Sequence, residues 1–383
     1  MIETVRFQNY KGFEDVEVKL ERLTVFVGPN ASGKTSVLSG IESISHSKEV
    51  NPDTVFFSRS NFNPYYIYKR RARAKMVLSW TGPSGGVCVT AIPPKDYDSI
   101  NVTLYKGEPQ GFEVTVERRD STNGKWIKAP SFLAESRLAG RTPSPSLMLR
   151  LEGARLAAPS VVQDPLVRMK SDGTGLASVL ANLALSDPDL FLEIQHHVAR
   201  VIPTVQRIRF ARSVVAVLEE EVIRVDHESM TRKVTRQMTE EKLLFDMKGA
   251  PSLPVESVSE GTLFIVGLIT VLYGPDRPKL LLIDDLDHAL HPRAQRELVK
   301  LLRELLAADP ELQIVATTHS PYLLDALKPE EVRFTTRRDD GSCVCGALVD
   351  HPDFERWKEE MAPGEMWSVF GEDWVAKLHP LGK

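Results

Sequence analysis

The sequence predicts an α/β fold with a doubly wound parallel sheet, on the basis of three apolar runs that each end in polar residues. Residues 23–27, 279–283 and 312–318 are rich in Leu, Val and Ile, which is typical of buried strands. Between the second and third runs, residues 293–306 have apolar side chains at helical spacing and predict a crossover helix. The three strand ends should therefore meet at one edge of the sheet, where such folds bind their ligands.

A glycine loop follows the first run and matches the pattern G-x-x-x-x-G-K-[ST] at every fixed position. A strand that leads through such a loop into a helix directs several backbone N–H groups at one anion. Lys34 can reach the β- and γ-phosphates, and Thr35 supplies a hydroxyl for Mg²⁺. We therefore predict a site for ATP and Mg²⁺. The predicted nucleotide-binding residues of this loop are Gly28, Pro29, Asn30, Ala31, Ser32, Gly33, Lys34, Thr35 and Ser36.

Carboxylates and a histidine follow the other two runs. Asp284 and Asp285 end the second run, and His319 follows the third. Successive strand side chains face opposite ways, so only a turn of the backbone at Asp285 would bring both carboxylates into one site. We predict Asp284 and Thr35 as Mg²⁺ ligands, and Asp285 and His319 as catalytic residues for nucleotide hydrolysis.

Another short motif precedes an apolar helical stretch at residues 263–272. Ser259 is a suitable N-cap, and Gly261 permits close backbone approach. By itself the segment fits a capped, buried helix.

The order of these segments resembles the ABC-type ATPase heads of the OLD, RecF and SMC proteins. Ser259-Glu260-Gly261-Thr262 is similar to their signature motif, and Thr318-His319-Ser320-Pro321 to their switch-histidine segment. Residues 9–13, 172–181 and 291–292 also fit this group. The resemblance, over residues 1 to about 330, implies a P-loop NTPase head of ABC type spanning residues 1–350. It further implies a homodimer around ATP, in which Ser259 and Gly261 of one protomer cap the γ-phosphate held by Lys34 of the other.

The sequence departs from the family pattern at two places. The family usually has Glu where this chain has Asp285, and the shorter side chain implies slow or partner-stimulated hydrolysis. Residues 287–289 also differ from the usual acidic-Asn-Gly run, so cross-subunit contacts cannot be transferred in detail.

The insertions predict the remaining parts of the head. Alternating β-formers over about 75–130 predict an antiparallel β lobe, about 160–205 a helical lobe, and about 205–250 hairpins. No heptad pattern is sustained, so we expect no long coiled coil. The Trp-rich tail, residues 351–383, is open to two interpretations: an interface with another protein, or packing on its own ATPase core, which we favour.

Partners are less well defined by the sequence. The basic run at residues 69–75, with tyrosines before it, fits a nucleic-acid contact and a solvated strand lead-in equally well. The net charge of −4 argues against general coating of nucleic acid. The three cysteines, the N-terminal strand pattern and the short apolar runs predict a cytoplasmic protein with no membrane segment.

These observations support three hypotheses. The first is an ATPase switch subunit of the OLD/RecF-like class that controls a separate effector, such as a nuclease, in antiphage defence. OLD nucleases carry a Toprim domain after the switch histidine, and the sequence after Ser320 contains no such carboxylate set, so we do not expect this chain to be the nuclease. The second is a RecF-like DNA-repair clamp, and the third is a catalytically idle nucleotide-binding scaffold.

Overall fold

The computed structural model describes residues 1–45, 76–82, 85–91, 99–105, 112–117, 146–161, 168–225, 228–275 and 277–378. The chain forms two compact units, and each is assembled from separate stretches of sequence. Unit 1 contains residues 1–148, 278–287 and 299–383, and unit 2 contains residues 149–277 and 288–298.

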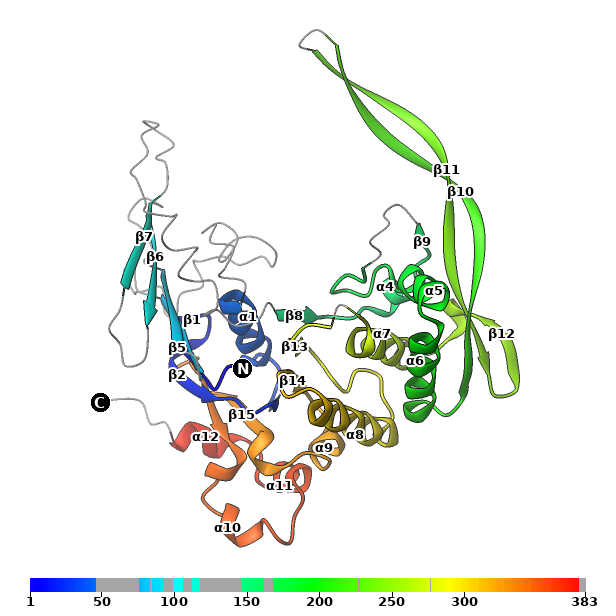
Figure 1. Ribbon diagram of the computed structural model, residues 1–383. Coiled ribbons are helices and arrows are strands. Elements are labelled where there is room, and N and C mark those ends of the chain that lie inside the picture. Colours follow the sequence, from blue (N-terminus) through cyan, green and yellow to red (C-terminus); the bar gives the residue numbers. More distant parts are fainter. Residues whose placement is uncertain are drawn as a thin grey trace. The chain divides into compact units, whose positions relative to one another are not determined.

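Unit 1 is built on a mixed sheet of twelve strands in the order β7-β6-β5-β4-β1-β2-β16-β15-β3-β14-β13-β8 (Figure 1). Its centre is parallel: β3 pairs with β14 and β15, and β14 pairs with β13. Every residue of β3 and β13 is buried, as their continuous apolar sequences predict. The predicted α/β sheet is therefore confirmed. The bounds of its central strands are β3 (Leu23–Val27), β13 (Leu280–Ile283), β14 (Gln313–Thr318) and β15 (Val332–Arg337).

Antiparallel strands extend this sheet on the N-terminal side. β1 pairs with β2 on one edge and with β4 on the other, and β4 to β7 then follow one another as a meander. The predicted antiparallel β lobe is thus a continuation of the main sheet. The strands are β1 (Thr4–Tyr10), β2 (Phe13–Lys19), β4 (Met76–Gly82), β5 (Gly85–Ala91), β6 (Ser99–Tyr105) and β7 (Phe112–Glu117). At the other edge of the sheet, β8 (Ser146–Leu149) lies next to β13.

The C-terminal tail folds onto unit 1. Trp374 is 7% exposed, and its ring lies 5.7 Å from that of Phe334 in β15 and 5.0 Å from that of His351. This contact agrees with packing of the tail on its own core. The helices and the last strand of unit 1 are α1 (Lys34–Ser45), α9 (Pro321–Leu324), β16 (Cys343–Ala347), α10 (Phe354–Trp357), α11 (Pro363–Phe370) and α12 (Asp373–Leu378). The helix α8 (Pro292–Ala308) begins in unit 2 and ends in unit 1.

Unit 2 contains a helical group around α7 (Glu260–Tyr273). This helix is apolar on nearly all sides, and it packs against α4 (Gly153–Leu156), α5 (Leu176–Ser186) and α6 (Pro188–Val201). Within the described ranges, every helix is too short or too polar to span a lipid bilayer.

A long twisted hairpin rises from unit 2 (Figure 1). It consists of β10 (Val205–Val225) and β11 (Glu228–Met247). Among the described residues, the base of β11 also pairs with β9 (Ser160–Val161) and β12 (Ala250–Pro254). The sequence predicts hairpins over about 205–250, and the structure forms one long hairpin there. The sequence contains neither Gly nor Pro between residues 204 and 248, so nothing breaks the two strands before the tip.

Candidate nucleotide-binding site

The phosphate loop connects β3 to α1 at the carboxyl end of the parallel strands. Gly33 has a φ of +103°, and a Cβ there would lie 2.8 Å from Cζ of Phe13, so only glycine fits. The Oγ of Ser32 lies 2.6 Å from the Oγ1 of Thr335, which fixes the loop to the neighbouring β15. The loop is thus held by the strands on which it rests.

Lys34 is the first residue of α1 and is only 6% exposed. Its Nζ donates hydrogen bonds to the carbonyls of Gly28 at 2.8 Å and Pro29 at 2.9 Å. Burial lowers the pKa of Lys34, and the carboxylates of Asp285, Asp284 and Asp287 oppose that shift. The site therefore combines one buried ammonium group with three nearby carboxylates.

Thr35 and Asp284 meet across this edge of the sheet. The Thr35 Oγ1 lies 3.1 Å from both carboxylate oxygens of Asp284, although the two residues are 249 positions apart in the sequence. A hydroxyl and a carboxylate are suitable ligands for Mg²⁺, which completes its coordination with water and substrate phosphates. The described residues contain no group of three or more His, Cys, Asp or Glu side chains that could hold a metal. A site with two protein ligands and a nucleotide fits this donor set.

Asp285 lies just beyond the end of β13, where the backbone turns. Its φ is +54°, an unusual left-handed conformation for a residue with a side chain. Burial, followed by the neighbouring Asp284, raises the pKa of Asp285, and His319 acts against this rise. The Nε2 of His319 lies 3.9 Å from Oδ1 of Asp285. The two residues predicted as catalytic therefore lie next to each other.

The histidine segment is positioned by Asp287. Its Oδ1 accepts hydrogen bonds from the hydroxyl of Thr318 at 2.6 Å and from the backbone N–H of His319 at 3.1 Å. The His319 side chain is 40% exposed, so it remains accessible to a ligand.

Three residues of this site did not emerge from the sequence as site residues: Asp287, Thr335 and Thr317. In the sequence, Asp287 is part of a departure from the family pattern, and Thr335 belongs to no motif. Thr317 donates a hydrogen bond to Asp284 Oδ1 at 2.8 Å. The sequence feature that could have pointed to Thr317 is the Thr317-Thr318 pair at the end of an apolar strand. Adjacent strand residues point to opposite faces of a sheet, so the two hydroxyls must lie on different faces.

The signature segment belongs to unit 2 rather than unit 1. Ser259 is the N-cap of α7 and accepts a hydrogen bond from the N–H of Thr262 at 3.3 Å. Ser259 and Glu260 are exposed, whereas Gly261 and Thr262 are buried. A Cβ at Gly261 would lie 2.2 Å from the carbonyl oxygen of Ala289, so packing within the chain already requires this glycine.

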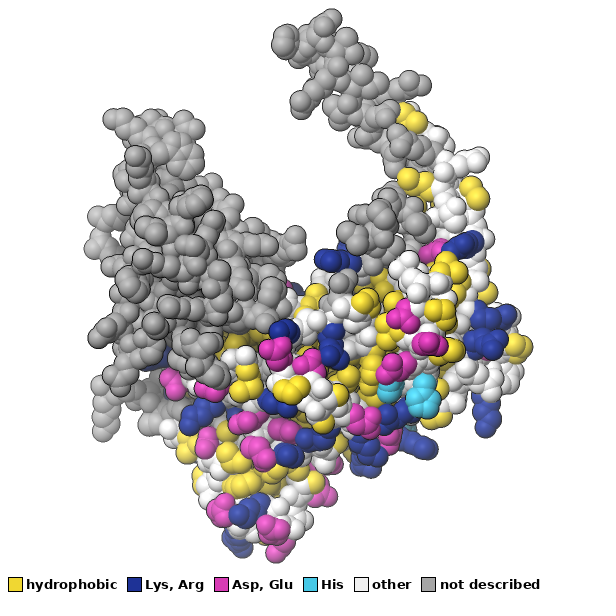
Figure 2. Space-filling model, in the orientation of Figure 1, with side chains coloured by type: hydrophobic (Ala, Val, Ile, Leu, Met, Phe, Trp, Pro, Cys, Tyr) yellow, Lys and Arg dark blue, Asp and Glu magenta, His cyan; other side chains and the backbone are white. Residues whose placement is uncertain are grey.

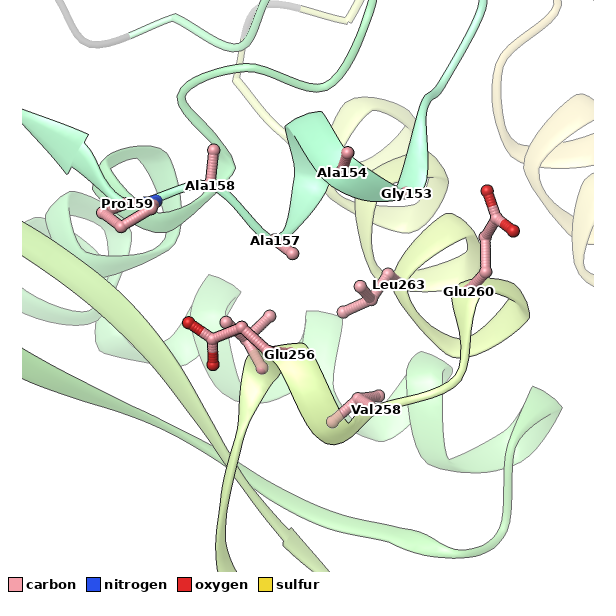
Figure 3. Close-up of a pocket in the computed structure, with 10 residues that line it drawn as sticks. Gly153, Ala154, Ala157, Ala158, Pro159, Glu256, Val258, Glu260 and Leu263 are labelled. Atoms are coloured by element: carbon pink, nitrogen blue, oxygen red, sulfur yellow. The ribbon is translucent and has the colours of Figure 1, made fainter.

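A cavity of about 510 Å³ lies beside the signature segment in unit 2 (Figure 3). Glu256 and Glu260 lie on opposite sides of it, and the other lining residues are small or apolar. Acidic side chains without a lining cation are unsuitable for phosphate, so this cavity is not a second nucleotide site. The lining residues are Gly153, Ala154, Ala157, Ala158, Pro159, Val255, Glu256, Val258, Glu260 and Leu263.

The basic run predicted at residues 69–75 lies outside the described residues. On the described part of the face seen in Figure 2, basic and acidic side chains intermingle. The structure therefore leaves the nucleic-acid interpretation as it stood.

Comparison with protein families identifies the chain. A family model described as "AAA domain, putative AbiEii toxin, Type IV TA system" matches residues 90–325, more than half of the 383 residues. The chain belongs to this AAA domain family. A second model, described as an AAA ATPase domain, matches residues 1–102, which include the phosphate loop.

Curated relatives agree with this assignment. The OLD nuclease of Thermus scotoductus is 23% identical over 355 residues, covering 89% of this chain and 63% of the relative. The Septu protein PtuA of Bacillus thuringiensis is 42% identical over 57 residues, which are 15% of this chain and 14% of the relative. The chain thus spans less than two thirds of the length of both relatives.

Solved structures agree on the fold. An SMC head bound to the C-terminal winged-helix domain of ScpA has a TM-score of 0.53 at 14% identity, covering 90% of this chain and 97% of that one. An SMC head with an extended coiled coil, bound to the C-terminal domain of ScpA derived from Pyrococcus furiosus, has a TM-score of 0.50 at 13% identity, covering 94% and 98%. The family match shows an AAA domain, and these structures confirm the predicted fold of an ABC-type ATPase head.

Proposed function

We propose that this chain is an ATP-binding and ATP-hydrolysing switch subunit that dimerises around ATP and controls a separate effector, a nuclease, in antiphage defence. The observation that carries most weight is the approach of the Thr35 hydroxyl to both carboxylate oxygens of Asp284, at 3.1 Å each. It supports a Mg²⁺ site immediately beside the loop that would hold the phosphates.

In the proposed reaction, water attacks the γ-phosphorus and the bond to the ADP oxygen breaks, which gives ADP and phosphate. Thr35 and Asp284 would hold Mg²⁺, which would offset the negative charge of the phosphates. Lys34 and the loop N–H groups would bind the phosphates, and Asp285 would accept a hydrogen bond from the attacking water. The short side chain of Asp285 favours slow turnover unless a partner adjusts the site.

Dimerisation follows from the exposed start of α7. Ser259 caps this fourteen-residue helix, whose N-terminus carries a partial positive charge that suits a phosphate from a second protomer. The similarity to SMC heads and to an OLD nuclease supports a paired arrangement. The short match to the Septu protein PtuA supports a role in antiphage defence.

The decisive experiment combines turnover with mass. Asp285→Asn should bind ATP, hydrolyse it far more slowly than the wild type, and accumulate as a dimer in light scattering with ATP and Mg²⁺. Equal turnover in the wild type and this variant would remove Asp285 from its role. An unchanged mass with and without ATP would contradict the dimer, even if hydrolysis is observed.

The alternative function is an ATP-dependent DNA clamp of RecF type. It depends on the basic run at residues 69–75, and no contact among the described residues favours it over the switch. The switch should bind a nuclease and the clamp should bind DNA. DNA binding by the isolated chain would therefore favour the clamp.

A further inference from the structure

In unit 1, the strand β13 ends immediately before Asp284 and Asp285. β13 and β14 pair in parallel from Leu280 with Gln313 to Ile283 with Ala316. The next residues in this register are Asp284 and Thr317, but the strand ends at Ile283 and Asp285 adopts a left-handed φ of +54°. Other bonds must therefore fix the residues beyond β13.

Thr317 supplies those bonds. Its hydroxyl donates to Asp284 Oδ1 at 2.8 Å and accepts the backbone N–H of Asp285, also at 2.8 Å. Its carbonyl oxygen accepts the N–H of Leu286 at 2.8 Å. One residue of β14 therefore holds three successive residues after β13, and its side chain does so at the two carboxylate residues.

We propose that Thr317 is a positioning residue of the nucleotide site: its hydroxyl orients the Asp284 carboxylate toward Thr35 and the metal, and holds Asp285 in its left-handed turn. This inference rests on the proposed function, because it assumes that Mg²⁺ and ATP bind at Thr35 and Asp284. Thr317 itself is fully buried and would not touch the nucleotide.

The hydroxyl is the part of Thr317 that matters in this role. Valine has the same shape but would leave Asp284 without this donor and the Asp285 N–H without this acceptor. Serine retains the hydroxyl and loses only a methyl group. The pair Thr317→Val and Thr317→Ser therefore separates hydrogen bonding from packing.

A matched control lies in the neighbouring strand, toward the amino end of the parallel strands. Thr24 in β3 is also fully buried, and its hydroxyl also makes two bonds, from the N–H of Glu21 at 2.8 Å and to the carbonyl of Glu21 at 3.2 Å. Thr24→Val removes the same kind of buried hydroxyl away from the carboxyl ends of the strands. It should lower stability without changing metal binding.

The test measures Mn²⁺ binding by electron paramagnetic resonance in the presence of a non-hydrolysable ATP analogue. Thr317→Val should weaken Mn²⁺ by about 10- to 100-fold, the usual effect of losing a bond that orients a metal ligand, while Thr317→Ser and Thr24→Val stay near wild type. Binding of the analogue in EDTA should be the same in all four proteins.

Each other outcome overturns the inference. Wild-type Mn²⁺ affinity in Thr317→Val would show that Asp284 needs no help from the hydroxyl. Loss of analogue binding in EDTA by both Thr317→Val and Thr24→Val would reduce Thr317 to a folding role. Failure of the proposed function looks different, because the wild-type protein itself would then bind neither the analogue nor Mn²⁺ with it.

Discussion

At the scale of single residues, the nucleotide site contains residues with unusual backbone conformations. Ala31 in the phosphate loop and Asp285 beyond β13 both have left-handed φ angles, +62° and +54°, although neither is glycine. Such conformations cost energy and persist where the surroundings enforce them, frequently at functional sites. Here Thr317 accounts for the enforcement at Asp285.

Lys34 provides the first prediction at this scale. Its ammonium group is the cation that faces Asp284, Asp285 and Asp287, so Lys34→Ala should leave these carboxylates to repel an incoming phosphate. We expect ATP binding to weaken by on the order of 100-fold or more, the effect of losing a charged hydrogen bond. Isothermal calorimetry with ATP and Mg²⁺ measures this.

The control for that variant is Lys19→Ala, because Lys19 is exposed on β2. It should bind ATP like the wild type. If Lys34→Ala also does so, Lys34 has no part in the site.

At the scale of elements, the sequence predicted those strands and helices whose apolar runs lie next to nucleotide-binding motifs. β3 begins and ends where expected, and β13, β14, α7 and α8 lie within a few residues of their predicted bounds. By contrast, β15 was missed, although it flanks β3, because its threonines and arginines match no motif. The crossover helix predicted that β14 lies beside β13, but the rest of the sheet order was beyond reach, since periodicity shows which residues are buried and not which strands lie side by side.

Within the site, the sequence identified groups more readily than the bonds that position them. The motif contains Thr35 and Asp284, and the structure places them in contact. The supporting Thr317 looks in sequence like any buried strand threonine. For Gly261 the motif suggests a phosphate contact, whereas the structure shows that close packing against Ala289 already requires a glycine there.

The tail helices give a prediction at the scale of elements. His351 is buried against Trp374 and Phe370, and burial lowers its pKa below the ordinary value of 6.5. The unfolded chain therefore takes up a proton at His351 before the folded chain does. Stability from this group is fully present above pH 6.5 and should fall as the pH drops toward the lowered pKa.

Thermal unfolding at pH 7.5 and 5.5 tests this relation. His351→Phe keeps an aromatic ring in the cluster and removes the titrating group, so the loss of melting temperature between the two pH values should be smaller than in the wild type. A larger loss in His351→Phe would contradict the assigned direction.

At the scale of the whole molecule, the candidate nucleotide site and the signature segment belong to different units. The phosphate loop is part of unit 1, and Ser259 is part of unit 2. A mechanism in which two protomers share ATP uses both units, one from each protomer. It predicts that damage to one unit can spare nucleotide binding while it prevents assembly.

Ser259→Arg is the variant that tests this separation. An arginine at the exposed N-cap of α7 should leave ATP binding by the monomer largely intact, and should block dimer formation and hydrolysis. Light scattering on the Asp285→Asn background measures the first effect, and phosphate release measures the second. Ser186→Arg, on the exposed end of α5, is a control of equal size and charge in the same unit. Full turnover in Ser259→Arg would exclude a paired-head mechanism.

The pairing of β3 also has a consequence for biosynthesis. Leu23 pairs with Ile314, so the strand that carries the phosphate loop leaves the ribosome long before either of its neighbours exists. At about 5–20 residues per second, the wait is roughly 15 to 60 s. During that time a largely apolar strand has no native partner, whereas most of unit 2 lies in the continuous stretch 149–277 and can fold earlier. A nascent chain shorter than about 313 residues would carry the complete phosphate loop with no sheet to hold it, and would depend on chaperones to keep β3 from pairing with the wrong chain.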